Sequence, residues 1–267
     1  MNRKQEYMDR LLVHYNYAQE HCQYPIFGVF LVGSQNYGLD DEQSDVDAYA
    51  MYIHPPKKPK RHISLEYSPE KGQTTPYPFY SWLKGMKTQQ ISKVLLESLS
   101  TDYVFINPLF QEEWEQLLKI KEYLFKYYAS NFHFAMLTEY ETILNRIKSR
   151  PYYKENFSIP VRCNKKEAIH CKRLQLILEQ GDPSLTPAQL LKMNFLSPEE
   201  RNDLILQRRG RKEIQIQELL TRPFTPNDSF NLQAPSMQKD SFLDTEIQQI
   251  WDSVLSKIEK SKKELTK

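Results

Sequence analysis

Hydrophobic residues follow two different spacings along the chain, which separate helical from extended stretches. In residues 3–21 they recur every three or four positions, which predicts an amphipathic helix. Residues 26–32 form an unbroken apolar run that ends before a Gly-Ser pair, and this pattern predicts a strand buried on both faces. In residues 45–53 the side chains alternate, so a second strand is predicted, with Asp45 and Asp47 facing the same way.

The remaining sequence predicts one hairpin and then a series of helices. Residues 62–67 and 74–80 are expected to pair around Gly72, although two prolines disfavour a central position for the second arm. From Trp82 onward helical spacing dominates. Helices are expected at about residues 91–99, 114–128, 133–148, 164–180, 187–193, 198–209 and 244–264, and residues 222–240 are expected to form a linker.

This order of elements predicts an α+β fold made of two domains. Residues 1–110 are expected to form a small domain around a mixed sheet, and residues 111–267 an all-helical C-terminal domain. The chain of 267 residues is long enough for each domain to bury a hydrophobic core of its own.

Composition and charge exclude several classes of protein. No stretch approaches about 18 consecutive apolar residues, so we expect no transmembrane helix and no membrane partner. The charged N-terminus lacks the pattern of a secretory signal, so we expect a cytoplasmic protein. The 36 basic and 34 acidic residues give a net charge of +2, which by itself gives no argument for nucleic-acid binding. Three cysteines without a CxxC pair predict neither a disulfide framework nor a zinc ribbon.

A Gly-Ser pair and two aspartates form the candidate chemical site. Gly33 and Ser34 follow the first predicted strand, and Asp45 and Asp47 come after ten further residues. Glycine lets the backbone approach a polyphosphate closely, and the N–H groups and hydroxyl of such a turn donate to phosphate oxygens. Aspartates two apart on a strand lie on one side with Cα atoms roughly 6.6 Å apart. That spacing suits two Mg²⁺ ions, which bridge carboxylates and substrate phosphates.

The stretches VGSQNYGL at residues 32–39 and SDVD at residues 44–47 resemble the DNA polymerase β-like nucleotidyltransferases. They look like a narrower branch of that family, the predicted nucleotidyltransferases of bacteria and phages that carry GSxxYGL and SDxD. LLESL at residues 95–99 and KKEAIHCKRL at residues 165–174 are similar to later motifs of that branch. The resemblance spans about residues 28–181 and implies a polymerase β-like fold for the first predicted domain.

The resemblance also implies roles for individual residues. Gly33 and Ser34 would hold a nucleoside triphosphate, and Asp45 and Asp47 would bind Mg²⁺, with two ions expected. The family usually has a third carboxylate on a following strand, which serves as metal ligand and general base, and Glu66 is the nearest substitute in this chain. The nucleotide-binding positions expected in this chain are Gly33, Ser34, Tyr37, Lys166, His170 and Arg173.

Several of these residues also have a purely structural interpretation. His170 and Arg173 share a helical face with Lys166, where they either contact phosphate or base or are satisfied by neighbouring groups and water. Tyr37 either stacks on a base or packs within its loop. Glu97 either orients a basic residue or serves an ion pair in the core.

The resulting hypothesis is a nucleotidyltransferase. It transfers a nucleoside monophosphate from an NTP, expected to be ATP, to an acceptor hydroxyl and releases pyrophosphate. The acceptor is left open among an RNA end, a protein and a small molecule. The alternative is a catalytically degenerate member that binds a nucleotide or a protein partner, since residues 72–77 contain no acid where the third carboxylate is expected.

Overall fold

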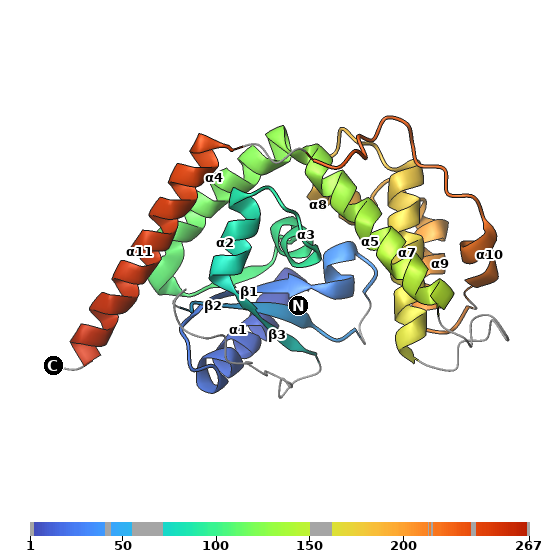
Figure 1. The fold of residues 1–267 in the computed structure, drawn as a ribbon. Coiled ribbons are helices and arrows are strands. Elements are labelled where there is room, and N and C mark those ends of the chain that lie inside the picture. Colours follow the sequence, from blue (N-terminus) through green and yellow to red (C-terminus); the bar gives the residue numbers. More distant parts are fainter. Residues whose placement is uncertain are drawn as a thin grey trace. The chain divides into compact units, whose positions relative to one another are not determined.

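The structure is an α+β fold with one four-stranded mixed sheet, as the sequence predicts (Figure 1). The computed structural model describes residues 3–40, 44–54, 72–149, 162–212, 214, 216–235 and 239–265. The strand order is β3-β2-β1-β4. In the sheet, β1 (Ile26–Val32) pairs antiparallel with β2 (Asp47–Tyr52) and β4 (Val104–Ile106), while β3 (Thr74–Pro78) runs parallel to β2.

Helices account for the other regular elements that the structure describes. Two short 3₁₀ segments, η1 (Gly33–Tyr37) and η2 (Pro108–Phe110), follow β1 and β4. The α-helices are α1 (Arg3–His21), α2 (Phe79–Lys87), α3 (Lys93–Ser100), α4 (Gln111–Tyr127), α5 (Ala129–Ser149), α7 (Arg162–Gln180), α8 (Pro187–Leu191), α9 (Pro198–Arg208), α10 (Ile216–Thr221) and α11 (Ser241–Leu265).

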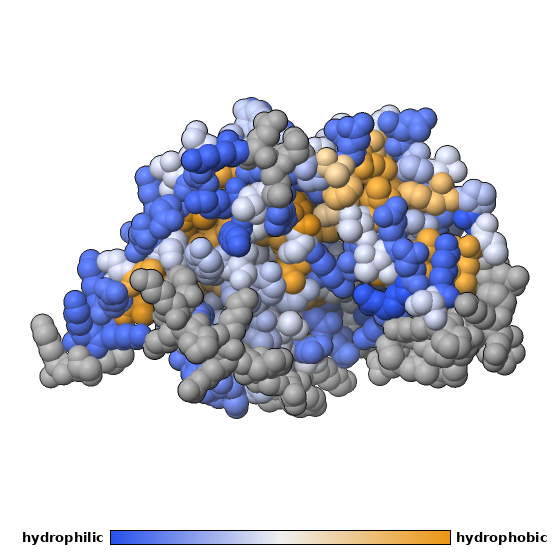
Figure 2. All heavy atoms as spheres, viewed as in Figure 1, coloured by the Kyte–Doolittle hydropathy of each residue, from blue (hydrophilic) through white to orange (hydrophobic). Residues whose placement is uncertain are grey.

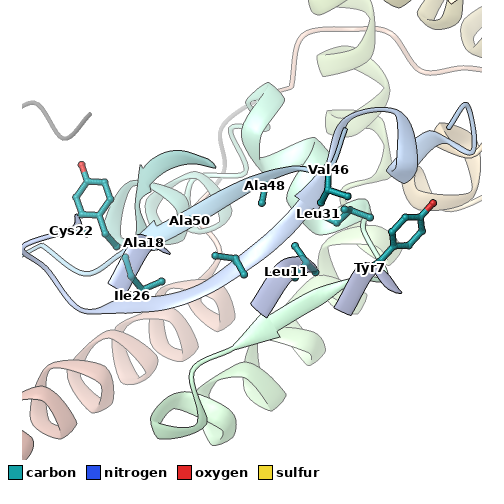
Figure 3. Close-up of a cluster of buried hydrophobic side chains, with 11 residues drawn as sticks. Tyr7, Leu11, Ala18, Cys22, Ile26, Leu31, Val46, Ala48 and Ala50 are labelled. Atoms are coloured by element: carbon teal, nitrogen blue, oxygen red, sulfur yellow. The ribbon is translucent and has the colours of Figure 1, made fainter. Parts of the chain in front are cut away.

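Helix α1 covers one face of the sheet. Its buried side chains are spaced by three and four residues, so they form one stripe along the helix. Figure 3 shows this stripe against the alternating buried residues of β1 and β2. The cluster comprises Tyr7, Leu11, Ala18, Cys22, Ile26, Val29, Leu31, Val46, Ala48, Ala50 and Tyr52.

Aromatic side chains fill the opposite face of the sheet. Phe27 of β1 stacks on Phe79 of α2, with ring centroids 4.1 Å apart. Phe30 contacts Trp82 of α2 at 5.5 Å and Trp114 of α4 at 5.6 Å between centroids. All seven residues of β1 are buried, which confirms the prediction of a strand covered on both faces.

The structure confirms most of the predicted helices and adds elements that the hydrophobic pattern missed. Ser197 caps α9 with a capping box, and Pro198 begins that helix, both as expected. Strand β4 and helix α10 are too short, at three and six residues, to show a hydrophobic period. The predicted partner of β3, residues 62–67, lies outside the described residues. In the described part of the sheet, β3 pairs in parallel with β2.

The chain divides into two compact units whose boundaries differ from a division near residue 110. The first unit comprises Met1–Asn36, Glu42–Tyr128 and Ser236–Lys267, and the second comprises Tyr37–Asp41 and Ala129–Pro235. Helices α4 and α11 therefore belong to the same unit as the sheet. The order of elements in the sequence places both helices after residue 110, in the predicted helical domain. Which unit a helix joins depends on its tertiary contacts, and these cannot be read from the sequence.

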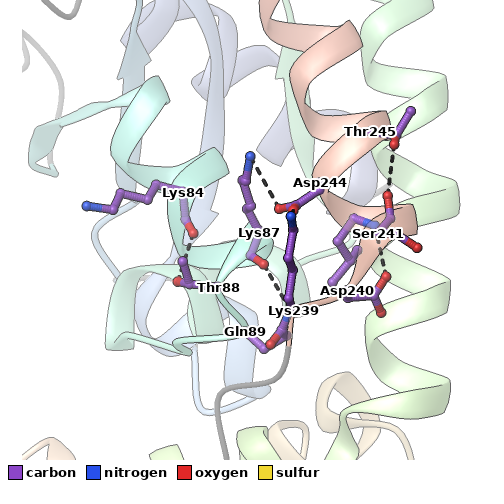
Figure 4. Close-up of polar contacts among 10 residues, drawn as sticks. Lys84, Lys87, Thr88, Gln89, Lys239, Asp240, Ser241, Asp244 and Thr245 are labelled. Atoms are coloured by element: carbon purple, nitrogen blue, oxygen red, sulfur yellow. Dashed lines mark hydrogen bonds and ion pairs between the residues drawn. The ribbon is translucent and has the colours of Figure 1, made fainter.

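Contacts of α11 explain its place in the first unit. Lys257 of α11 forms ion pairs of 2.9 Å with both Glu112 and Glu113 of α4. Near the start of α11, Asp244 pairs with Lys87 of α2 at 3.3 Å (Figure 4). Trp251 of α11 adds an aromatic contact to Tyr80 of α2, at 5.2 Å between ring centroids.

The second unit is built around α5 and α7, which pack against each other. Their facing stripes combine buried Met136 and Tyr140 of α5 with buried Ala168 and Leu174 of α7. On the visible face, Figure 2 shows mainly hydrophilic side chains over α11, with hydrophobic patches elsewhere. No helix among the described residues is long and apolar enough to cross a membrane.

Candidate functional site

Asp47 lies beside the turn that follows β1. It begins β2 and pairs with Val32, the last residue of β1, so its neighbour across the sheet leads directly into Gly33. A Cβ atom placed on Gly33 would lie 3.3 Å from Oδ2 of Asp47. Gly33 also has a φ of +82°, which glycine adopts without the steric cost that other residues meet. Two parts of the sequence motif, the carboxylate of Asp47 and the turn at Gly33, therefore lie next to each other in the fold.

The carboxylate of Asp47 is oriented by backbone next to β3. The N–H of Gln73 donates to Oδ1 of Asp47 at 3.0 Å, and the carbonyl of Gln73 accepts from the N–H of Ala48 at 2.9 Å. These two bonds fix one oxygen of the carboxylate against the start of β3, whereas Oδ2 is the oxygen nearest Gly33. A carboxylate anchored in this way presents its second oxygen in a defined direction.

Asp45 lies on the same side of the chain as Asp47. From residue 44 to residue 50 burial alternates: Val46 and Ala48 are fully buried, whereas Asp45 and Asp47 are half-buried. Because alternate residues of an extended segment point to the same side, the two carboxylates face away from α1. The buried side-chain amide of Gln35 donates to the carbonyl of Asp45, which ties this segment to the turn.

Ser34 and Gln35 shape the interior of the turn. The hydroxyl of Ser34 donates to Oε1 of Gln35 at 3.3 Å, and both side chains are buried. Sequence reasoning missed Gln35, whose only signal is its place between the Gly-Ser pair and the tyrosine of the motif. In the structure it is the side chain that connects the turn to Asp45.

Glu97 of α3 extends the polar face that carries Asp47. The hydroxyl of Tyr49, two residues after Asp47 on β2, donates to Oε2 of Glu97 at 2.9 Å. The side-chain amide of Asn36 donates to the backbone carbonyl of Glu97 at 3.1 Å. Glu97 is 6% exposed, so this network attaches α3 to both the turn and the strand. These contacts favour the structural interpretation of Glu97, because they connect α3 to β2 and to the turn.

His14 of α1 supports the aspartate segment from the other face of the sheet. Its Nδ1 lies 2.7 Å from the hydroxyl of Thr74, the first residue of β3, and the ring also hydrogen-bonds to the backbone of Val46. Burial is the main cause that lowers the pKa of His14 to about 4, so the ring is neutral at pH 7. The residue falls on the buried stripe between Leu11 and Ala18, which is the signal that sequence reasoning overlooked.

The other expected nucleotide-binding residues lie in the second unit. The guanidinium carbon of Arg173 is 3.3 Å from the centroid of the Tyr37 ring, which places the cation on the ring face. Nη2 of Arg173 lies 2.8 Å from Nδ1 of His170. The guanidinium has no acceptor, so Nδ1 of His170 accepts and the ring carries its proton on Nε2, 3.6 Å from Oε1 of Glu139.

Two further arginines surround the loop that contains Tyr37. Arg208 of α9 donates to the backbone carbonyl of Leu39 at 3.0 Å. A Cβ atom on Gly38, whose φ is +66°, would lie 3.1 Å from Nη1 of Arg201. Residues 37–39 therefore contact arginines of α7 and α9, which explains why this loop belongs to the second unit although its neighbours in sequence belong to the first.

The structure thus forms two groups from the expected site residues. Gly33, Ser34, Asp45 and Asp47 come together in the first unit, and Tyr37, His170 and Arg173 in the second. Lys166 is exposed on α7, one turn before His170. Glu66 lies outside the described residues. In the described part of the chain, no three His, Cys, Asp or Glu side chains form a group able to hold a metal ion.

The oxygens of Asp45 and Asp47 nevertheless match the ligands that Mg²⁺ prefers. The pair is half-buried, and Oδ2 of Asp47 lies beside the turn at Gly33, which is half-buried as well. Comparison with known proteins adds no family: the chain matches neither a protein-family model nor a curated protein.

Proposed function

We propose that this chain is a Mg²⁺-dependent nucleotidyltransferase with a polymerase β-like catalytic domain. The observation that supports the proposal is the position of Asp47, whose Oδ2 is the nearest atom to the missing side chain of Gly33. A metal-binding carboxylate must lie beside the loop that holds the triphosphate, and these two residues meet that requirement.

Each residue of the first group has a role in this reaction. Gly33 lets the phosphates approach the backbone, and the N–H groups of η1 donate to phosphate oxygens. Asp45 and Asp47 would hold Mg²⁺, which supplies positive charge where negative charge develops on the phosphate oxygens. Gln73 orients the carboxylate of Asp47, and Gln35 holds the backbone of Asp45 next to the turn, so the site is partly organised before substrate arrives.

The reaction proposed is phosphoryl transfer at the α-phosphorus of ATP. The acceptor hydroxyl oxygen forms a bond to that phosphorus, the bond from phosphorus to the oxygen bridging the β-phosphate breaks, and pyrophosphate leaves. The hydroxyl proton passes to a base, for which Glu66 is the expected residue. The acceptor is an RNA end, a protein or a small molecule.

Transfer of label from ATP tests the proposal. The protein is incubated with ATP labelled at the α-phosphate, Mg²⁺ and a cell extract, and the labelled product is separated by size and by nuclease or protease sensitivity. We expect a labelled acceptor and released pyrophosphate with the wild type, and neither with Asp47→Asn. Asp252→Asn, an exposed aspartate on α11, is the matched control that keeps activity.

The outcome also separates the two hypotheses derived from the sequence. Saturable, Mg²⁺-dependent binding of ATP without any labelled acceptor supports the degenerate, nucleotide-binding alternative. Equal labelling by wild type and Asp47→Asn contradicts the assignment of the site.

A further inference from the structure

A buried arginine in the second unit lacks an acidic partner. Arg173 is 2% exposed, and in the described part of the chain no carboxylate forms an ion pair with it. The Nε and Nη1 atoms of its guanidinium are buried without a hydrogen-bond partner there. Arginine does not lose its proton in proteins, so this charge persists after burial. An uncompensated buried charge lowers the free energy of unfolding by several kcal/mol, and a bound anion would offset this cost.

The groups that do contact Arg173 leave its charge unbalanced. The Tyr37 ring lies 3.3 Å from the guanidinium carbon, and this cation–π contact contributes about 2 kcal/mol at a desolvated site. Nδ1 of His170 accepts from Nη2 at 2.8 Å. Both partners are neutral, so they orient the guanidinium without compensating it. The N–H on Nε and the N–H groups on Nη1 have no acceptor among the described residues.

The charges around Arg173 favour a phosphate group over a single carboxylate. Lys166, His170 and Arg173 are spaced by four and three residues and share one face of α7. Of the neighbouring acids, Glu167 pairs with Arg146 at 3.1 Å, and Oε1 of Glu139 lies 3.6 Å from Nε2 of the neutral His170. Lys166 and Arg173 place two positive charges on this face, which a phosphate group balances better than a single carboxylate does. Arginine also binds phosphate oxygens through several N–H donors.

We infer that Arg173, oriented by Tyr37 and His170, binds the phosphate group of a small molecule within the second unit. The inference uses residues of this unit only. Because these residues are also expected nucleotide-binding positions, the inference deepens the proposed function and rests on it for the choice of ATP as a ligand. Its test is separate, because the carboxylates of Asp45 and Asp47 take no part in it.

Nuclear magnetic resonance of histidine ring nitrogens tests the site directly. The full-length protein, labelled with ¹⁵N in its histidines, is titrated with inorganic phosphate, pyrophosphate and ATP, each in a separate arm. Sodium chloride and sodium acetate at the same ionic strength are the reference arms. We expect saturable shifts of the Nδ1 and Nε2 signals of His170, because a bound anion adds a negative charge beside the guanidinium that donates to Nδ1. His133, which lies in the same unit, is expected to stay unchanged.

The arms identify the source of the phosphate. Shifts with inorganic phosphate alone show a site for the free anion, whereas shifts only with ATP show that a nucleotide carries the group. Either result supports the inference. Shifts of equal size with acetate contradict the choice of phosphate, and an unchanged His170 signal in every phosphate arm overturns the site.

Variants connect the shifts to Arg173. Arg173→Gln is expected to weaken phosphate binding about tenfold or more, and Arg146→Gln, which removes an exposed arginine of α5, to leave it unchanged. Circular dichroism checks the folding of both proteins. If Arg173→Gln does not fold, Arg173→Lys keeps the charge but loses the planar donor set, and unchanged binding by that variant contradicts the proposed role.

Discussion

Gly72 lies so close to Val46 that a Cβ atom on the glycine would be 1.7 Å from the carbonyl oxygen of Val46. No L-residue other than glycine fits there without moving the backbone, and the φ of +141° at Gly72 adds a second restriction. This contact places Gln73 where its N–H reaches Asp47. The close approach of the two backbones therefore determines the direction of the candidate metal-binding carboxylate.

Replacement of Gly72 by alanine tests this packing. We expect Gly72→Ala to lower the free energy of unfolding by about 3 kcal/mol, because the β3 backbone must move away from β2. Urea denaturation measures the change. Gly38→Ala is the matched control: its φ is also positive, but the nearest atom is the flexible end of Arg201, so we expect a loss of about 1 kcal/mol. Equal losses in the two variants would show that the contact with Val46 is unimportant.

The link between Tyr49 and Glu97 gives a second prediction. Tyr49→Phe removes a hydroxyl that donates to a buried carboxylate oxygen, and we expect it to destabilise the protein by about 2 kcal/mol. Glu97→Gln keeps an acceptor for that hydroxyl and should cost less. A double-mutant cycle by urea denaturation measures the coupling between the two side chains. Additive effects, with no coupling energy, would contradict a direct interaction.

Stability is expected to fall in mild acid because of His14. Above its unfolded pKa of 6.5 the ring is neutral in both states, so folding gains or loses no proton. As the pH falls from 6.5 towards 4, His14 becomes protonated in the unfolded chain but stays neutral in the folded protein. The free energy of unfolding therefore decreases. The pKa difference corresponds to a loss of at most about 3 kcal/mol.

Tryptophan fluorescence isolates this effect. All three tryptophans, at positions 82, 114 and 251, belong to the first unit, which also contains His14. We expect His14→Gln to flatten the pH dependence of urea unfolding followed by fluorescence. His133→Gln is the control, since burial lowers the pKa of His133 to about 4 as well but this residue lies in the second unit. A steep pH dependence that persists in His14→Gln would assign the titration to another group.

The start of α11 depends on Asp240. Its Oδ1 accepts from the N–H of Leu243 at 3.1 Å, and its Oδ2 accepts from the hydroxyls of Tyr123 at 3.0 Å and Tyr128 at 2.6 Å. Asp240→Ala removes a helix cap and two tyrosine contacts, so we expect a loss of about 3 kcal/mol. Hydrogen exchange should show faster opening of the first turns of α11. Asp252→Ala, on the exposed side of the same helix, should change stability by about 0.5 kcal/mol or less.

The sequence determined the local elements and the types of residue at the candidate site. Strong periods and end signals located α1, β1 and α9, because burial and capping depend on neighbours within a few residues. The spacing of Asp45 and Asp47 predicted a shared side, and the burial pattern of the segment agrees with that expectation. The assignment of a nucleotidyltransferase remains a proposal.

Only the tertiary structure decided which distant residues meet. Gln73 reaches Asp47 because β3 joins β2 in parallel, and His14 reaches Thr74 because α1 covers that face of the sheet. Neither pairing leaves a periodic pattern in the sequence, since each depends on how separate elements pack. The loop at Tyr37 belongs to the second unit for the same reason. Its aromatic ring packs on the guanidinium of Arg173 of α7, and this contact forms only in the folded chain.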